Sequence, residues 1–504
     1  MLMKVFSKKL SLIFCLFAFS WAHGLSLAPN YEQEKLAKVI ASKLRTQHLN
    51  SSSEWQSRGD QVGVLILNTL DPSRSLFTMR DLDTVELDTF AEQIEHGKLD
   101  LAFYLYNKYL ERAEERLNFW INFLEKNPEE IDLDDDEELM ERSTSTSWLK
   151  DKKNLKQLWR LQLEAELIRL ILSDEPRNEA TASLVKRFNA QRKRLLQTRS
   201  DDAFANVINS FAKAYDPHTA FLPKADSENF NINMSLSLQG IGAVLQREDE
   251  YTKVTSLIAG GPADLDGRLK PADRILGVGQ GQDAIENVLG WRLDEVVNLI
   301  RGPKGSLVRL EVRSSDNLKT RIIEIIRDNV QLEDQSASSE IIENPTDPHQ
   351  KIGVINIPTF YSDFTALQRG DPDYRSTTRD VKKLILDLKN NNVSGIVIDL
   401  RNNSGGSLRE SYELAGLFIE SGPVVQIRSS GGRISLRGDR DDEIFWTGPM
   451  AVLVDRLSAS ASEIFAGAIQ DYGRGLIIGD DTFGKGTVQQ LIPIEDGQLK
   501  VTIA

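Results

Sequence analysis

The spacing of apolar residues changes along the chain, and this change restricts the fold more than any other feature of the sequence. Between residues 30 and 225 apolar side chains recur every three or four positions, as they do on one face of a helix. From about Leu236 short β-rich runs separated by glycine take their place. After residue 331 strand-like and helix-like runs alternate, which is typical of an α/β layer. The 504 residues are therefore expected to form several domains.

The first region contains several helix-like runs. The longest has apolar positions that predict one buried face, made of Phe103, Tyr106, Leu110, Ala113, Leu117, Trp120 and Leu124. Leu155–Leu172 and Thr181–Thr198 show similar patterns. The stretch Pro128–Ser147 is acidic and then rich in serine and threonine. Its alternating aspartates resemble a calcium loop, but Glu137 and Ser143 stand where that loop needs glycine and glutamate, so a solvated linker is predicted.

The N-terminus has the pattern of a secretory signal peptide. Lysines precede the apolar stretch Leu10–Trp21, which is too short to span a bilayer comfortably. Ala22 or Gly24 would precede the cleavage point. We therefore expect residues 1–24 to be removed on export, and the alternative is a retained N-terminal anchor.

Charge and cysteine content limit the partners and the compartment. The formal net charge of -14 argues against an electrostatic grip on nucleic acid or anionic lipid. The sole cysteine, Cys15, lies in the expected leader, so the mature chain would have no thiol, which suits an oxidising compartment. No histidine pair has metal-ligand spacing. We predict a periplasmic protein without metal or other cofactor, associated with the inner membrane at most peripherally.

The last region, residues 331–504, is expected to be an α/β domain. Strands are predicted at Ile352–Ile357, Gly395–Leu400, Val424–Ile427, Ala451–Val454 and Leu476–Ile478, and helices at Arg379–Lys389, Leu408–Glu420 and Ser462–Tyr472. The chain stops at Val501–Ala504, inside a β-like run without a cap or turn. This ending suggests a fragment of a longer protein.

Ser460 is the candidate nucleophile. It lies on a loop of small residues between a strand-like run and a helix expected to begin near Ser462. A hydroxyl at this junction lies beside the unpaired N–H groups of the first helical turn, and the N–H of Ala461 would stabilise an oxyanion. The alternative is that Ser460 and Glu463 form a capping box and nothing more.

Lys485, between Gly484 and Gly486, is the candidate base. A serine hydroxyl needs a neighbouring base, and a lysine serves only when desolvation lowers its pKa toward the working pH. Gln489 would hold the amine by a hydrogen bond. The alternative is a surface lysine at a tight turn. A phosphate-binding loop nearly fits residues 479–487, but Gly486 stands where a hydroxyl is required and a strand follows.

The loop from Arg401 to Ser407 would supply the second half of an oxyanion hole. Gly405 and Gly406 allow backbone N–H groups to converge on an anion, although an ordinary strand-to-helix turn has the same composition. A histidine-based triad is disfavoured because none of the five histidines lies near Ser460 in the sequence.

The middle region has the pattern of a peptide-binding module. Gly240-Ile241-Gly242 precedes a strand and would form a nest of N–H groups for a peptide carboxylate. The edge of that strand can then take the peptide as an additional strand. On the helix predicted at Trp291–Arg301, a pocket for an apolar terminal side chain would be lined by Val296, Val297 and Ile300. A plain β domain is the alternative.

Together these motifs resemble the tail-specific, or C-terminal processing, serine protease family, most closely its long periplasmic members from Gram-negative bacteria. The resemblance covers Asp216-Pro217-His218-Thr219, Leu238–Arg313 as a PDZ domain, the Gly405-Gly406 loop and Ser458–Gln490. It implies a multidomain α+β protein. A helical N-terminal domain (25–225) would precede a PDZ-like module (236–330) and an α/β serine protease core of crotonase or ClpP-like type (331–504).

The resemblance also implies roles for individual residues. Ser460 would be the nucleophile, Lys485 the general base and Gln489 the residue that orients the lysine. N–H groups near Gly405 or Gly406, together with Ala461, would form the oxyanion hole. Asp471 matches an acidic position of the long members, with structure at a helix end as the alternative.

The predicted function is that of a periplasmic serine endopeptidase with a Ser/Lys dyad. It would bind apolar, unstructured C-terminal tails of proteins through the PDZ domain, and an adaptor protein would be a further partner. The alternative is a catalytically inactive peptide-binding scaffold with a truncated core.

Overall fold

The computed structural model describes residues 26–50, 61–131, 138–314 and 319–504. The predicted leader and the alternating aspartates of the linker lie outside the described residues. The chain divides into two compact units, Met1–Phe221 and Leu222–Ala504. Among the described residues, no helix combines the length and the apolar composition that crossing a membrane requires.

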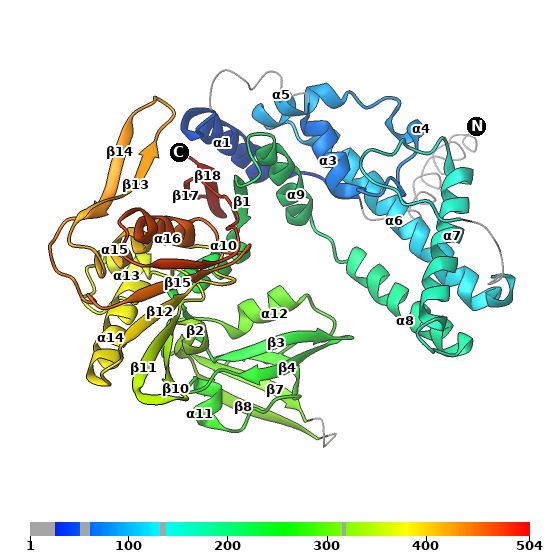
Figure 1. The fold of residues 1–504 in the computed structure, drawn as a ribbon. Coiled ribbons are helices and arrows are strands. Elements are labelled where there is room, and N and C mark those ends of the chain that lie inside the picture. The colour runs from blue at the N-terminus through cyan, green and yellow to red at the C-terminus, as the bar shows by residue number, and fades with distance from the viewer. Residues whose placement is uncertain (1–25, 51–60, 132–137, 315–318) are drawn as a thin grey trace, which may run out of the picture. The chain divides into compact units, whose positions relative to one another are not determined.

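The first unit is helical, as predicted (Figure 1). Its longest helix, α6 (Asp100–Lys126), buries every residue of the predicted apolar face. The other main helices are α1 (Tyr31–Gln47), α3 (Val62–Leu70), α5 (Phe90–Glu95), α7 (Lys152–Ile171), α8 (Arg177–Leu195) and α9 (Ser200–Lys213).

Helices α6, α7 and α8 share one hydrophobic cluster, in which two tryptophans also satisfy their polar atoms. The indole N–H of Trp120 donates to the carbonyl of Trp159 at 2.7 Å. The indole N–H of Trp159 in turn donates to the carbonyl of Ser75 at 2.7 Å. Buried indoles need such partners, so these bonds fix how α6 and α7 pack.

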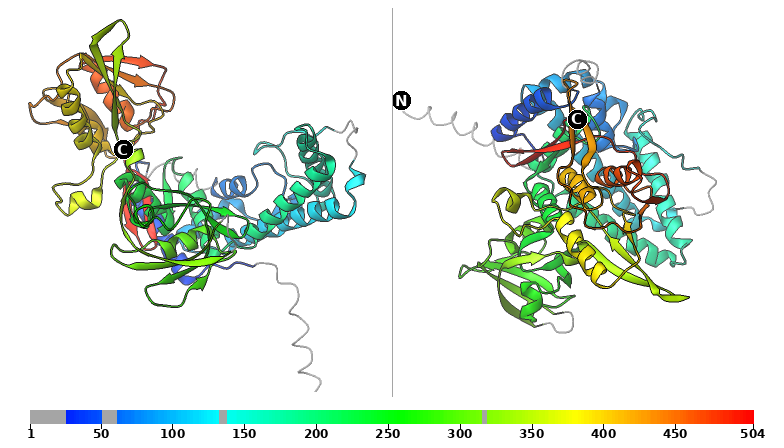
Figure 2. Two further views of the ribbon diagram at one scale, coloured as in Figure 1. Left: turned by 90° about the horizontal axis from the view of Figure 1, so that it is seen from below. Right: turned by 60° about the vertical axis from the view of Figure 1, so that its left-hand side comes forward.

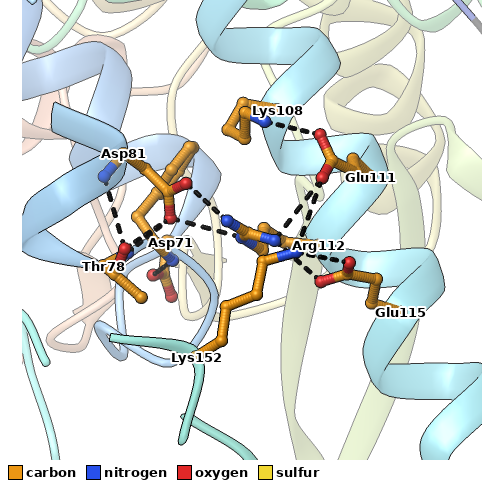
Figure 3. Close-up of polar contacts among 9 residues, drawn as sticks. Asp71, Thr78, Asp81, Lys108, Glu111, Arg112, Glu115 and Lys152 are labelled. Carbon is orange, nitrogen blue, oxygen red and sulfur yellow. Dashed lines mark hydrogen bonds and ion pairs between the residues drawn. The ribbon is translucent and has the colours of Figure 1, made fainter. Parts of the chain in front are cut away.

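Buried polar side chains join α6 to the loops around it (Figure 3). The Arg112 side chain is 3% exposed and pairs with Asp81 at 2.5 Å and with Glu115 at 2.8 Å. Burial raises the pKa of Asp81, but hydrogen bonds from Arg112 and Thr78 outweigh it and hold this pKa below its usual value. Asp71 accepts backbone N–H groups of Ser75, Leu76 and Phe77, which closes the neighbouring loop.

The Asp216-Pro217-His218-Thr219 motif forms a hydrogen-bonded turn at the end of the first unit. His48 is 1% exposed, and its Nε2 lies 2.6 Å from the Asp216 carboxylate. That carboxylate also accepts the N–H groups of His218 and Thr219. Burial raises the pKa of Asp216, but these hydrogen bonds reverse the shift and hold it well below the usual range. The motif is therefore a structural tie between α1 and the chain that follows α9.

The second unit begins with a β module. Its sheet has the order β3-β4-β5-β7-β8, so β3 (Ala243–Glu248) and β8 (Thr320–Ile326) are the edges. The inner strands are β4 (Tyr251–Leu257), β5 (Arg274–Gln280) and β7 (Leu307–Arg313), and α12 (Leu293–Ile300) packs on them. A separate ribbon of β2 (Ser237–Gly240) and β9 (Asp328–Gln331) joins the two ends of the module.

Most of the residues after β9 form an α/β core, and β17 (Gln489–Ile494) pairs with β18 (Gly497–Thr502) outside its central sheet. Parallel strands β11 (Asp347–Asn356), β12 (Gly395–Asp399), β15 (Met450–Val454) and β16 (Leu476–Gly479) are flanked by the antiparallel edge strand β10 (Ser338–Asn344). Helices α14 (Thr377–Asn390), α15 (Leu408–Gly416) and α16 (Ala461–Asp471) share one hydrophobic cluster with this sheet (Figure 1 and Figure 2). The loops that follow β11, β12 and β15 thus emerge at one edge, where parallel sheets place their sites.

The predicted fold class and the strands of the core are confirmed, but the predicted end of one helix is wrong. The helix predicted at Leu408–Glu420 ends at Gly416. Glycine is a weak helix former, and a Cβ at Gly416 would lie 2.6 Å from Cγ of Asp439. Asp439 ends the hairpin of β13 (Gly422–Arg428) and β14 (Ile434–Asp439), whose second strand the sequence did not reveal.

Removing the buried guanidinium should destabilise the helical unit. We expect Arg112→Ala to lower the free energy of opening of α6 by about 3–5 kcal/mol, because the Asp81 carboxylate would be left buried without its counter-ion. This loss of stability should become smaller as the pH falls through the lowered pKa of Asp81, because the carboxylate then becomes neutral. Amide hydrogen exchange of α6 measures the change.

Lys152→Ala is the matched control. Its ammonium pairs with Glu115 at 2.8 Å but the side chain is 53% exposed, so removal should cost at most about 1 kcal/mol. Equal effects of the two substitutions would contradict the importance given to the buried pair.

Candidate active site

The loop between β15 and α16 presents Ser460 at the sheet edge. Asp455 begins the loop, and its carboxylate accepts the N–H groups of Leu457 and Ser458 at 3.0 Å each. The Ser458 hydroxyl is fully buried and donates to the carbonyl of Leu400 at 2.8 Å. These bonds hold the loop against the end of β12, so the small residues of the sequence motif are needed for close packing.

Ser460 itself has an unusual backbone conformation. It is the N-cap of α16, with φ 55° and ψ -110°. A residue other than glycine rarely adopts positive φ, and such strain is kept only where the surroundings impose it. The half-buried Ser460 therefore lies at the helix start that the sequence predicted, held in a conformation that free chains avoid.

The Glu463 carboxylate connects the serine loop with the lysine loop. It accepts the N–H of Ser460 at 2.6 Å, the N–H of Lys485 at 2.9 Å and the N–H of Gly484 at 2.6 Å. The Thr482 hydroxyl adds a fourth donor at 2.8 Å. Burial raises the pKa of Glu463, but these donors outweigh burial and keep the pKa below its usual value. The carboxylate is therefore held ionised as a bracket between the two loops.

Sequence reasoning identified Glu463 only as the last residue of a capping box. The S-x-x-E spacing did reveal its bond to the Ser460 N–H. Its bonds to Thr482, Gly484 and Lys485 join segments that are separated by β16, and no local pattern indicates them.

Lys485 is half-buried, and its ammonium lies against Gln489 at the start of β17 (Gln489–Ile494). Nζ donates to Oε1 of Gln489 at 2.6 Å. The amide nitrogen of Gln489 donates to the hydroxyls of Thr487 at 3.0 Å and of Thr502 at 3.1 Å. Those two acceptors fix the orientation of the amide, so its oxygen faces the lysine. Because a strand and not a helix follows, the loop lacks the helix N-terminus of a phosphate-binding loop.

The loop after β12 touches the serine. A Cβ at Gly405 would lie 2.9 Å from Cβ of Ser460 and 3.2 Å from the nitrogen of Ala461. Gly405 has φ +105°, so both space and conformation require glycine there. At Gly406 (φ +143°) a Cβ would lie 2.2 Å from the carbonyl oxygen of Phe360.

The N–H groups around the serine have different partners. The N–H of Gly405 donates to Oδ1 of Asn403 at 2.8 Å. In the part of the chain that the structure describes, the N–H of Gly406 has no acceptor. The N–H of Ala461 belongs to the first helical turn and has no acceptor within its helix. Ala461 directly follows Ser460, and Gly406 directly follows Gly405, which packs against Ser460. Among the described residues, each loop therefore leaves one N–H group open close to the serine in the sequence or next to a residue that touches it.

Asp471 is not brought to this group. It is exposed at the last position of α16. Because that helix has 11 residues, Asp471 lies about 16 Å along the helix axis from the end at Ser460. Within the described ranges, no cluster of histidine, cysteine, aspartate and glutamate is arranged to hold a metal ion.

The predicted peptide-binding residues surround the edge strand β3. Gly240 ends β2, and Gly242 has φ +75°, with its would-be Cβ 3.3 Å from Cα of Gly261. The Ile241 carbonyl accepts the N–H of Ala263 at 2.8 Å, which holds the turn in place. On α12 the three predicted pocket residues differ in burial. Val296 and Ile300 lie in the hydrophobic core, while Val297 is half-exposed.

Comparison with known proteins gives three family matches along the chain. Residues 40–225 match the tail specific protease N-terminal domain. Residues 229–313 match the PDZ domain. Residues 351–504 match peptidase family S41.

Similar proteins carry related descriptions. A tail-specific protease of Haemophilus influenzae is 37% identical over 92% of this chain and 65% of its own length. A probable CtpA-like serine protease of Staphylococcus epidermidis is 31% identical over 60% of this chain and 56% of its own. The crystal structure of the PDZ domain of a carboxy-terminal protease from Vibrio cholerae, in complex with peptide, is 53% identical. The match covers 19% of this chain and 100% of the PDZ-domain chain, with a TM-score of 0.19. The chain thus spans less than two thirds of the length of these two curated relatives.

Replacing the bracket carboxylate should release the lysine loop. Glu463→Gln keeps one acceptor oxygen but replaces the other with an amide NH2 group. This donor would face backbone N–H groups that now donate hydrogen bonds to the carboxylate. We expect amide exchange of residues 483–487 to accelerate at least tenfold, roughly the loss of one hydrogen bond to a charged group. Glu420→Gln, at an exposed position of the same unit, is the control. Unchanged exchange in Glu463→Gln would show that the loop holds its place without the bracket.

Proposed function

Because the chain belongs to the tail-specific protease family, we propose that it is a serine endopeptidase that selects protein substrates by their C-termini. The main support is the meeting of three loops at the sheet edge. Glu463 joins the backbones of Ser460 and Lys485, and Gly405 packs against Ser460. A nucleophile, a base and N–H donors from different parts of the sequence thus lie in one small region.

In this proposal Ser460 and Lys485 form a catalytic dyad. The neutral amine of Lys485 takes the proton of the Ser460 hydroxyl as its oxygen attacks the substrate carbonyl. Gln489 accepts a hydrogen bond from Nζ and thereby orients the amine. The protonated lysine then gives its proton to the leaving amine. Water attacks the acyl-enzyme in the second half of the reaction and releases the new C-terminus.

The N–H groups of Gly406 and Ala461 would stabilise the oxyanion. Ala461 directly follows Ser460, and Gly406 directly follows Gly405, which packs against Ser460. Among the described residues, neither N–H is used by the hydrogen bonds that hold the loops. The N–H of Gly405 is a weaker candidate because Asn403 already accepts it at 2.8 Å. Donors fixed before the reaction need no reorganisation when charge develops, which is the main source of their effect. Asp471 would support the end of α16 rather than the chemistry.

The PDZ domain would capture the substrate tail. A tail added beside β3 would pair with the free edge of the sheet, and its carboxylate would meet the turn at Gly240–Gly242. The half-exposed Val297 on α12 would contact the terminal apolar side chain. Apolar, unstructured tails suit this mode because they can extend as a strand.

We also propose a periplasmic location, which rests on the signal-peptide pattern of residues 1–24. Substrates would then be exported proteins with apolar tails, with an adaptor protein as a further partner and peripheral contact with the inner membrane. The negative charge disfavours nucleic acid.

The dyad is tested with protein from residue 25 onward and an unfolded reporter that ends in an apolar tail. The parent should cleave it, and Ser460→Ala and Lys485→Ala should each lose activity by at least about 10³-fold, since nucleophile and base act as a unit. Lys383→Ala, whose side chain is 73% exposed, should cleave like the parent. Full cleavage by Lys485→Ala would refute the dyad, and binding without cleavage by the parent would favour an inactive scaffold.

Tail selection is tested on the PDZ domain. Val297→Asp should weaken binding of an apolar tail peptide at least tenfold, or about 1.4 kcal/mol, because a charge would enter the apolar contact. Cleavage of a short peptide without the tail should stay unchanged. Asn298→Asp adds the same charge at the exposed neighbouring position and should bind the tail like the parent. Equal binding by both variants would place the tail elsewhere.

A further inference from the structure

Asn403 is a fully buried polar residue in the loop after β12 that the proposed reaction does not use. It lies two residues before Gly405, in the turn that leads to α15. A buried amide must have all its polar atoms satisfied, so each of its partners is a constraint on the surrounding chain.

The side chain of Asn403 connects two neighbouring loops. Its Nδ2 donates to the carbonyl of Ile357, just after β11, at 2.7 Å. Its Oδ1 accepts the N–H of Gly405 at 2.8 Å. Because one end donates and the other accepts, the amide has a single orientation that satisfies both bonds. The Gly405 N–H therefore points to the interior, and the next N–H, that of Gly406, is left without an acceptor among the described residues.

The backbone of Asn403 holds the serine loop. Its carbonyl accepts the N–H of Ala459 at 3.0 Å and the hydroxyl of Ser462 at 2.9 Å. These two residues flank Ser460 and Ala461 on either side. The same residue thus fixes the Gly406 N–H through its side chain and the Ala461 N–H through its carbonyl.

We propose that Asn403 is the positioning residue that sets the two halves of the oxyanion hole relative to each other. This inference rests on the proposed function, because it concerns the donors of that site. Asn403 acts through Gly406 and Ala461 and does not itself contact the substrate. Its side chain should affect the transition state more than substrate binding, since the donors are needed when the oxyanion forms.

Aspartate is the informative replacement, since it has nearly the shape of asparagine. In Asn403→Asp the ionised carboxylate would accept the Gly405 N–H, but it has no donor for the Ile357 carbonyl and adds a buried negative charge near the oxyanion. A protonated carboxyl group has both a donor and an acceptor, as the amide has. Loss of function through Asn403→Asp should therefore be reversed by protonation.

The test measures kcat and KM of the parent, Asn403→Asp, Asn403→Ala and Asn402→Asp on the apolar-tailed reporter. We expect the two Asn403 variants to lose about 10²–10³ in kcat, as when an oxyanion donor is removed, with KM within about threefold of the parent. Asn402→Asp is the control, because Asn402 is exposed, uses its backbone N–H to bond Asp455, and has a positive φ that aspartate tolerates.

The pH dependence separates positioning from a general loss of structure. The ratio of kcat of Asn403→Asp to that of the parent should rise as the pH falls, whereas the ratio for Asn403→Ala should stay flat. Binding of the tail peptide should be the same in all variants. If Asn403→Ala does not fold, the pH dependence of the kcat ratio of Asn403→Asp to the parent decides alone whether Asn403 is a positioning residue.

The outcomes distinguish the two proposals. A parent that does not cleave overturns the proposed function and this inference with it. A parent that cleaves while both Asn403 variants keep its kcat overturns the inference alone. A pure rise in KM, or a ratio that does not change with pH, would also overturn it.

Discussion

The carboxylate of Glu463 is the interaction on which the rest of the site depends. Each loop at the sheet edge is short and lacks the regular backbone hydrogen bonds of a strand, so side-chain hydrogen bonds must hold its backbone in place. Glu463 does this by accepting the N–H groups of Ser460, Gly484 and Lys485. A charged acceptor makes stronger hydrogen bonds than a neutral one, and the lowered pKa of Glu463 keeps it charged. The helix start, where unpaired N–H groups favour a negative charge, is also the favourable place for it.

The same principle recurs in the other loops of this region. Asp455 closes the turn before Ser458 and also accepts the N–H of Asn402 at 3.0 Å. Asn403 joins the end of β11 to Gly405. The site is therefore built from side chain–backbone hydrogen bonds between neighbouring strand ends, of which those of Asn403 are buried. Such a network is stiff because every polar group that it buries must stay paired, and stiffness is what a proposed oxyanion hole requires.

Sequence reasoning succeeded where the physical signal is local. The apolar face of α6 was readable because helical residues three and four positions apart share a face, and all seven predicted residues of that face are buried. The core strands were readable as short apolar runs between turns. The hairpin β13–β14 was missed in part because its second strand carries glycine, arginine and exposed apolar residues without clean alternation. The end of α15 was predicted too late, because the close approach of Gly416 to Asp439, a residue from another element, leaves no local pattern.

The sequence by itself determined the order of the domains, the core elements and the short list of reactive residues. Glycine and small-residue motifs carry that information because only certain residues tolerate the backbone conformations involved. Only the tertiary structure decided that Gly405 donates its N–H to Asn403 while Gly406 does not. It also decided that Val296 and Ile300 lie in the hydrophobic core of the β module, and that Glu463 accepts the N–H of Lys485. These outcomes depend on contacts between strand ends far apart in the chain, and such contacts leave no periodic pattern in the sequence.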